Sequence, residues 1–140
     1  MARLTIRIDL TDHGAIGPGK VKLLELVGES GSISAAGRAM GMSYRRAWTL
    51  VDGLNRSFRS PLVTTQPGGA RGGGAALTDL GHDVIARYRA VERAAARASA
   101  PDLAALDAAR ATGSRSGRRA RSVAGTPRHR SPVMPRRARR

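Results

Sequence analysis

The sequence predicts a mainly α-helical domain with a small β component, a winged helix-turn-helix. Residues 31–48 suggest a short helix, a turn at Gly41 and a second helix that opens on Ser43 with basic residues facing outward. A glycine-rich segment, residues 65–75, follows further along the chain and predicts a two-stranded hairpin, the wing. A helix-turn-helix followed by a wing is typical of proteins that bind duplex DNA.

The N-terminal part predicts a strand followed by a helix. Residues 4–10 alternate strictly between apolar and polar side chains, which is typical of a half-buried strand. A turn region, residues 11–19, separates this strand from a helix that begins at Lys20, where apolar residues start to recur at helical spacing. Gly28 is the expected end of this helix.

The next two helices form the helix-turn-helix. Either Ser32 or Ser34 can cap the first of them. Gly41 suits the turn because a positive φ costs glycine little. Ser43 caps the second helix, whose apolar side is made of Ala47, Leu50, Val51 and Leu54. Trp48 lies beside this stripe, and we expect it to pack rather than to stack on bases.

The wing and a long helix complete the domain. Short strands at residues 62–65 and 75–77 are expected to flank the glycine-rich loop. Thr78 then caps a long helix with an apolar stripe. One more short helix is expected from Asp102 to about Ala111, with Pro101 in its first turn.

The end of the chain differs in composition from the rest. The first 107 residues contain 14 lysines and arginines and all 10 acidic residues, whereas residues 108–140 contain 11 arginines and no acid. We therefore divide the chain into a winged helix-turn-helix domain with a dimerisation helix, residues 1–98, and a largely disordered basic tail, residues 99–140. Because the tail dominates the net charge, DNA binding must be argued from the helix-turn-helix itself.

The composition excludes several other classes of protein. There is no cysteine, hence no disulfide, thiolate metal site or cysteine nucleophile, and the three histidines are too scattered for a metal site. No apolar run is long enough to span a membrane, and the first residues lack the apolar segment of a signal peptide. We expect a cytoplasmic protein that is not an enzyme and has no catalytic residues, cofactor or metal.

One segment matches the spacing of a nucleotide-binding P-loop. Residues 14–20 follow a strand and precede a helix, as that motif requires. However, Val21 stands where the motif needs a hydroxyl to hold Mg²⁺, and Pro18 removes a backbone donor. We interpret the segment as a turn that positions the first helix.

Candidate DNA-binding residues lie on the helix-turn-helix and in the wing. Arginine can bridge O6 and N7 of guanine, and tyrosine or threonine can reach a phosphate or a thymine methyl. The glycine-rich loop can approach a phosphate or enter the minor groove. The predicted set is Ser34, Ser43, Tyr44, Arg45, Arg46, Thr49, Arg71, Gly72 and Gly73. The alternatives are a solvated helix face and an ordinary flexible hairpin.

These motifs resemble the ModE-type molybdate-responsive regulators, whose DNA-binding half is a LysR-like winged helix. The resemblance covers roughly residues 4–92. It rests on Gly17-Pro-Gly-Lys20, Leu23-Leu-Glu-Leu26, Gly31-Ser-Ile-Ser-Ala-Ala36, Ala39-Met-Gly-Met-Ser-Tyr44, Ala47-Trp48, the polyglycine wing and Leu77-Thr78 followed by Gly81. It implies a sequence-specific transcriptional regulator, a homodimer with two recognition helices in successive major grooves of a palindromic operator. Gly37 departs from the family, which usually has alanine there.

The long helix and the first strand are expected to form the homodimer. The apolar stripe of the long helix exceeds what a small winged helix needs for its own core, which predicts pairing across a two-fold axis. The resemblance implies that the first strand takes part. The predicted interface residues are Leu4, Ile6, Val84, Ile85, Tyr88 and Val91.

The expected partners are therefore double-stranded DNA and a second copy of the chain, without a membrane. Full-length members of the family carry oxyanion-binding domains, and no strand pattern here could build one, so molybdate binding is not expected. Two alternatives remain, an auxiliary or nucleoid-like DNA binder with weak sequence preference and a winged-helix protein-interaction module. The outward pair Arg45 and Arg46 argues against the second.

Overall fold

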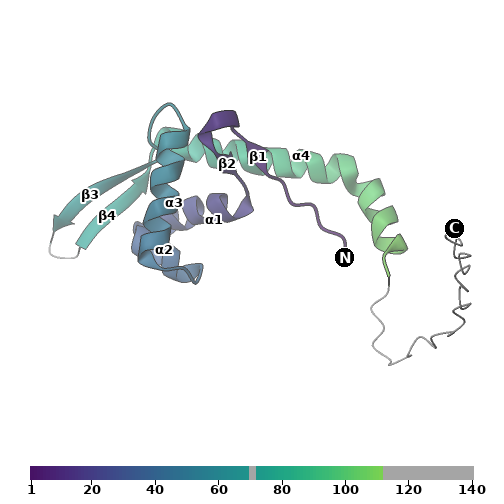
Figure 1. Cartoon of the computed structure of the whole chain (residues 1–140), viewed down its shortest axis with the longest axis horizontal. Coiled ribbons are helices and arrows are strands. Elements are labelled where there is room, and N and C mark those ends of the chain that lie inside the picture. The colour runs from purple at the N-terminus through teal and green to yellow at the C-terminus, as the bar shows by residue number, and fades with distance from the viewer. Residues whose placement is uncertain (70–71, 112–140) are drawn as a thin grey trace, which may run out of the picture. The chain divides into compact units, whose positions relative to one another are not determined.

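Four α-helices, one 3-10 helix and two small antiparallel sheets make up the part of the chain that the computed structural model describes, residues 1–69 and 72–111 (Figure 1). In chain order the elements are β1 (Ile8–Asp9), η1 (Thr11–His13), β2 (Ala15–Ile16), α1 (Pro18–Ser30), α2 (Ile33–Ala39), α3 (Tyr44–Ser57), β3 (Val63–Gly69), β4 (Gly72–Leu77) and α4 (Asp79–Ala109). This order confirms the predicted winged helix-turn-helix, with α2 and α3 as the helix pair and β3–β4 as the wing. No helix in this part is long and apolar enough to cross a membrane.

The N-terminal strand is shorter than predicted. β1 pairs antiparallel with β2, a strand that the sequence analysis did not identify, and the register places Ile8 opposite Ile16 and Asp9 opposite Ala15. Residues 4–7 have no partner strand within the described part of the chain, so their alternation does not produce a strand. Leu4, on the apolar face of the predicted strand, is 39% exposed.

The first helix is longer than predicted at both ends. Pro18 occupies the first turn, where its missing N–H costs no hydrogen bond. The helix passes through Gly28 and ends at Gly31, whose φ of 66° is left-handed and whose N–H donates to the Val27 carbonyl at 2.9 Å. Gly28 serves packing instead, because a Cβ there would lie 2.7 Å from Cδ1 of Leu77 in the wing.

The segment that matches P-loop spacing holds α1 against the small N-terminal sheet. Nζ of Lys20 donates a hydrogen bond to the carbonyl of Ala15 at 2.8 Å. This contact agrees with the interpretation of residues 14–20 as a turn that positions the first helix.

A single hydrophobic core joins the helices to the base of the wing. Its buried members are Ile16, Val21, Leu23, Leu24, Val27, Ile33, Ala36, Ala47, Val51, Leu54, Leu62, Val63, Val84 and Tyr88. α2 and α3 approach closely within it, since a Cβ on Gly37 would lie 2.8 Å from the Cβ of Ala47. The helix pair is therefore packed more tightly than an alanine at this position would permit.

α4 is one continuous helix from Asp79 to Ala109, so the separate helix predicted from Asp102 is wrong. Pro101 lies inside it, and the ribbon bends toward its C-terminal end, as expected where proline removes a helical hydrogen bond (Figure 1). The folded unit extends to Ala109 and not to residue 98. The rest of the predicted tail, residues 112–140, lies outside the described residues.

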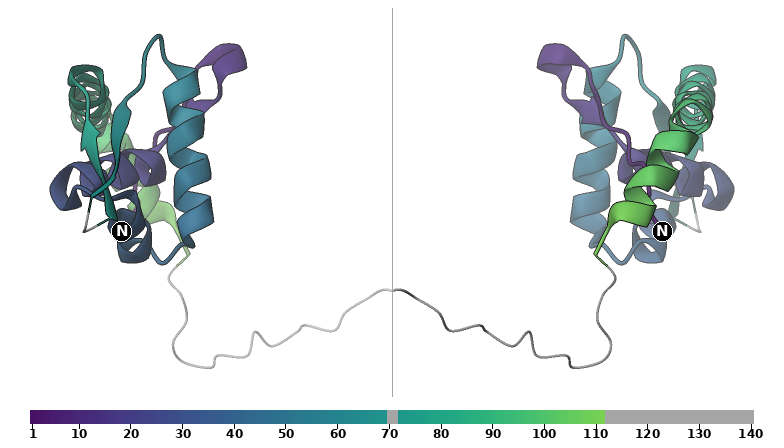
Figure 2. Two further views of the ribbon diagram at one scale, coloured as in Figure 1. Left: turned by 90° about the vertical axis from the view of Figure 1, so that its left-hand side faces the viewer. Right: turned by 90° about the vertical axis from the view of Figure 1, so that its right-hand side faces the viewer.

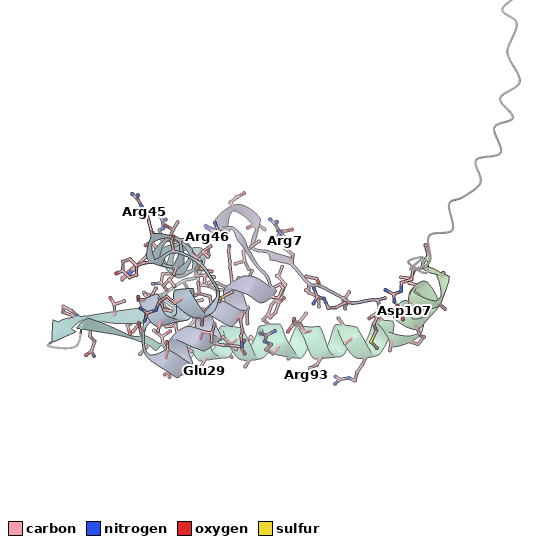
Figure 3. All side chains as sticks on the ribbon, turned by 90° about the horizontal axis from the view of Figure 1, so that it is seen from below. Arg7, Glu29, Arg45, Arg46, Arg93 and Asp107 are labelled. Atoms are coloured by element: carbon pink, nitrogen blue, oxygen red, sulfur yellow. The ribbon has the colours of Figure 1, made fainter. Side chains whose placement is uncertain are left out.

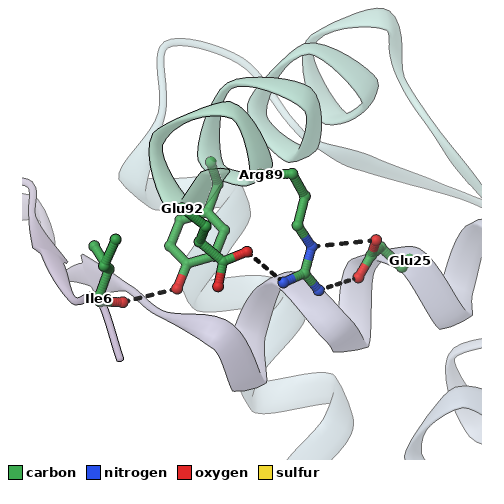
Figure 4. A network of polar contacts seen from close by, with 5 residues as sticks. Ile6, Glu25, Arg89 and Glu92 are labelled. Carbon is green, nitrogen blue, oxygen red and sulfur yellow. Dashed lines mark hydrogen bonds and ion pairs between the residues drawn. The ribbon is translucent and has the colours of Figure 1, made fainter. Parts of the chain in front are cut away.

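Polar contacts tie α4 to the N-terminal segment and to α1 (Figure 4). The Tyr88 hydroxyl donates to the carbonyl of Ile6 at 2.7 Å, and burial raises the pKa of this hydroxyl, with a further contribution from Glu92. Arg89 bridges Glu25 on α1 and Glu92 on its own helix, and hydrogen bonds to these two carboxylates raise its pKa. α1 and α4 are thus joined by a partly buried ion-pair network as well as by the core.

Candidate nucleic-acid interface

Two serine caps fix the helix pair. Oγ of Ser32 accepts a hydrogen bond from the Ala35 N–H at the start of α2, and Oγ of Ser43 accepts one from the Arg46 N–H at the start of α3, both at 3.1 Å. Of the two serines that the sequence offered for the first cap, the structure uses Ser32. Between the helices Gly41 has a φ of 69°, the left-handed turn that was predicted.

The recognition helix α3 has one buried face and one solvent face. At about 100° per residue, Ala47, Val51 and Leu54 fall together and are buried. The opposite ridge carries Arg45, Thr49, Asp52 and Arg56, all of them exposed. The N-terminal part of this ridge, with Arg45 and Thr49, can enter a groove, whereas Arg56 and Asp52 further along pair with each other.

The two arginines near the start of α3 have no ion-pair partner among the described residues. Arg45 and Arg46 are exposed and point away from α4 (Figure 3). By contrast, Arg56 on the same helix pairs with Asp52 at 2.8 Å. The positive charge at the start of α3 is therefore available to an external anion.

Side-chain hydroxyls frame these arginines. Oγ1 of Thr49 donates to the carbonyl of Arg45 at 2.9 Å, which fixes the threonine on the ridge. Ser43, Arg45, Arg46, Thr49 and Leu50 line a shallow hollow of about 300 Å³ on the side of α3 away from the wing. Five of the predicted DNA-binding residues thus belong to α3 or its cap, and the structure brings four of them together around this hollow.

A larger hollow of about 590 Å³ lies between α2, α3 and the wing. Its lining is Ser32, Ile33, Ser34, Arg38, Tyr44, Trp48, Thr65, Gln66, Pro67, Gly74 and Ala75. Trp48 is 37% exposed in it, so this side chain lies at the edge of the core rather than inside it. The reason is its angular position, on the flank of α3 toward the wing, where its ring meets that of Tyr44 edge-on at 6.2 Å.

The wing is longer than the two short strands predicted. β3 and β4 pair antiparallel from Val63 opposite Leu77 to Gly69 opposite Gly72, with an irregularity between Gln66 and Gly69. Of the predicted wing contacts, Gly72 and Gly73 lie in β4. Arg71 lies outside the described residues.

The base of the wing is held by a residue that the sequence analysis missed. Asn55 on α3 accepts hydrogen bonds from the N–H groups of Leu62 (2.9 Å) and Val63 (3.1 Å) and donates to the Val63 carbonyl at 3.1 Å. On the other side, Oγ1 of Thr78 donates to the carbonyl of Pro61 and caps α4 by accepting the Gly81 N–H. A polar residue inside an otherwise periodic helix was the available signal, because asparagine is unfavourable there.

The residues predicted to form a dimer divide into two groups. Val84 and Tyr88 are buried in the core of the chain itself, so this part of the predicted α4 stripe is already covered. Ile6 and Ile85 are half-buried, whereas Leu4 and Val91 are 39% and 43% exposed. Only this second group offers surface to a partner.

The chain is similar in sequence to several known proteins. No model of a known protein family matches the chain. The chain is 46% identical over 82 residues to the molybdenum-pterin-binding protein MopB of Rhodobacter capsulatus, which covers 59% of this chain and 30% of that protein. It is 37% identical over 92 residues to the molybdenum transport protein ModE of Azotobacter vinelandii, which covers 66% and 33%.

A third relative is named for its activity. The chain is 33% identical over 87 residues to the DNA-binding transcriptional dual regulator ModE of Escherichia coli K12, covering 62% of this chain and 33% of that protein. The chain is a homologue of ModE-type proteins over its N-terminal part. The predicted resemblance is thereby confirmed for that part. The chain spans about a third of the length of the ModE-type relatives it matches.

Proposed function

We propose that the chain is a sequence-specific DNA-binding transcriptional regulator. The observation that carries this proposal is the start of α3, where Arg45 and Arg46 stand exposed beside the Ser43 cap with no carboxylate partner among the described residues. An arginine on an outward helix can donate two hydrogen bonds to guanine in the major groove. Homology to a protein named as a DNA-binding regulator supports the same conclusion.

The ridge and the wing have different tasks in this proposal. Arg45 and Thr49 lie on the exposed ridge and read base edges, while Arg46 and the Ser43 hydroxyl lie beside the ridge and contact phosphates. The wing, including Arg71, Gly72 and Gly73, reaches the adjacent minor groove. Base readout then depends on a few residues of α3, and the remaining contacts set orientation and affinity.

A homodimer on a palindromic operator completes the proposal. α3 lies on one side of the folded unit and the beginning of α4 on the other (Figure 2). Pairing through the exposed Leu4 and Val91, with Ile6 and Ile85, leaves both copies of α3 free for DNA. Molybdenum appears in the names of some relatives; we assign that property to those proteins and not to this chain.

The test compares arginines of one helix. A duplex is first selected from a random pool by the full chain, and Arg45→Ala, Arg46→Ala and Arg56→Ala are then measured on it by footprinting and fluorescence anisotropy. A lost bidentate base contact costs about 1–3 kcal/mol and relaxes the preference at one base pair. We expect this for Arg45, and little change for Arg56, which Asp52 already pairs. Unchanged affinity and preference in both the Arg45 and Arg46 variants would refute the proposal.

A further inference from the structure

The hollow between α2, α3 and the wing is not explained by base reading. Two of its residues, Tyr44 and Trp48, lie on α3 but on the flank that faces the wing, away from the exposed ridge that carries Arg45. Tyr44 is 59% exposed and Trp48 37%, which is a large aromatic surface to leave in water. A hollow lined by such rings, outside the core, is suited to contact with another molecule.

The geometry of duplex DNA says what would pass through this space. A major groove and the minor groove next to it are always separated by one sugar–phosphate backbone. If α3 enters the first and the wing enters the second, that backbone must run between them. We propose that the hollow is the seat of this backbone segment, an inference that rests on the proposed function and adds a second, sequence-independent site to it.

The chemistry of the lining fits a sugar–phosphate chain. Arg38 is exposed and, among the described residues, forms no ion pair. The Ser34 hydroxyl and the Gln66 amide line the same hollow. These groups donate hydrogen bonds to phosphate oxygens, as arginine, serine and glutamine commonly do. No carboxylate is found among the lining residues that the structure describes. The site is therefore suited to a phosphate and not to a cation.

The aromatic pair Tyr44 and Trp48 fits the apolar part of the DNA backbone, the deoxyribose. The edge-on contact of Tyr44 with Trp48, at 73° between ring planes, presents a ring face beside a ring edge. A deoxyribose offers C–H groups of matching size, so the rings pack on sugar while Arg38 contacts the phosphate. Every nucleotide carries the same sugar and phosphate, so this contact adds affinity for any duplex without changing which sequence is preferred.

Trp48 allows a direct test in the unmodified protein because it is the chain's single tryptophan. Acrylamide quenching of its fluorescence is measured for the full chain alone, with the selected duplex and with an unrelated duplex of equal length at low salt, while anisotropy of labelled DNA confirms binding. The quenching constant should fall by about twofold or more in both complexes, because protein–DNA contacts bury the surface they use.

The outcomes separate this inference from the proposed function. DNA binding with an unchanged quenching constant would leave the proposed function standing and overturn the hollow as a backbone site. Protection by the selected duplex alone would also overturn it, because bases and not backbone would then fill the hollow. Absence of binding to any duplex would instead refute the proposed function itself.

An arginine pair gives a second, independent measurement. Arg38→Gln should weaken binding to the selected and the unrelated duplex by the same factor and reduce the salt slope of log affinity by about 0.9, the value for one phosphate contact. Arg56→Gln is the matched control, since that arginine is also exposed but pairs with Asp52. A change in base preference with Arg38→Gln, or no change in salt slope, would contradict the assignment.

Discussion

Asn55 is the residue by which the recognition helix holds the wing, and replacing it with alanine tests that role. The variant loses three hydrogen bonds, two that Oδ1 accepts from the N–H groups of Leu62 and Val63 and one that Nδ2 donates to the Val63 carbonyl. Leu62 and Val63 are almost fully buried, so water replaces the side chain poorly. At about 0.5–1.5 kcal/mol for each bond, we expect a loss of about 2–4 kcal/mol in unfolding free energy.

The assay is urea unfolding of the full chain followed by far-ultraviolet circular dichroism. With a typical dependence on denaturant, this loss lowers the midpoint by about 1–2 M. Asp52→Ala is the matched control, because it lies on the same helix, is exposed and loses only its ion pair with Arg56, at about 0.3–0.5 kcal/mol. An Asn55→Ala variant within about 1 kcal/mol of the wild type would refute the reasoning, since the wing base would then be held by other contacts.

Three further predictions concern other parts of the chain. Gly37→Ala should cost about 1–3 kcal/mol of unfolding free energy because its Cβ would meet that of Ala47 at 2.8 Å. Gly53→Ala on α3, where a Cβ would meet no atom within 4 Å, should not destabilise, and equal urea midpoints for the two variants would contradict the packing argument. The Tyr88 hydroxyl has a raised pKa because it is buried, so its contribution to the free energy of unfolding should be complete below about pH 10 and lost as the pH rises further. Tyr88→Phe should cost about 1 kcal/mol at neutral pH, and unfolding measured against pH should show no such alkaline loss in this variant. A chain ending at Ala111 lacks ten of the chain's arginines. In anisotropy titrations it should show a flatter dependence of log affinity on log salt and the same preferred sequence. Loss of that preference in a folded variant would contradict the assignment of base reading to α3.

The parts of the fold that were predicted correctly depend on local signals. Ser43 and Gly41 lie next to the backbone groups they serve, so a cap and a left-handed turn can be read from the sequence alone. The strand β2, Ala15–Ile16, could not be predicted from the sequence because it is too short to show alternation and forms only by pairing with β1. The continuous α4 was missed because Pro101 is normally a boundary signal, whereas here the helix accommodates it.

In the candidate site, too, the features that depend on local signals were predicted and those that depend on distant contacts were not. The periodicity of α3 predicted its outward arginines, since only the helical repeat is needed to separate a buried from an exposed face. It did not predict the position of Trp48 or the task of Asn55, because both depend on the wing, which is distant along the chain and close in space. Likewise the burial of Val84 and Tyr88 reflects packing that no stripe on a single helix reveals.

The wing base also bears on how the protein can change through evolution. Asn55 on α3 accepts a hydrogen bond from the Leu62 N–H, and Thr78 before α4 donates one to the Pro61 carbonyl. α4 also approaches this point closely, because a Cβ on Gly81 would lie only 2.3 Å from the Leu62 carbonyl oxygen. Inserting or deleting a residue at this junction would break several contacts at once. We therefore expect length variation among related proteins at the far end of the hairpin, where loops tolerate insertions. Related proteins can lengthen or shorten the wing, and so its reach along DNA, without disturbing the recognition helix.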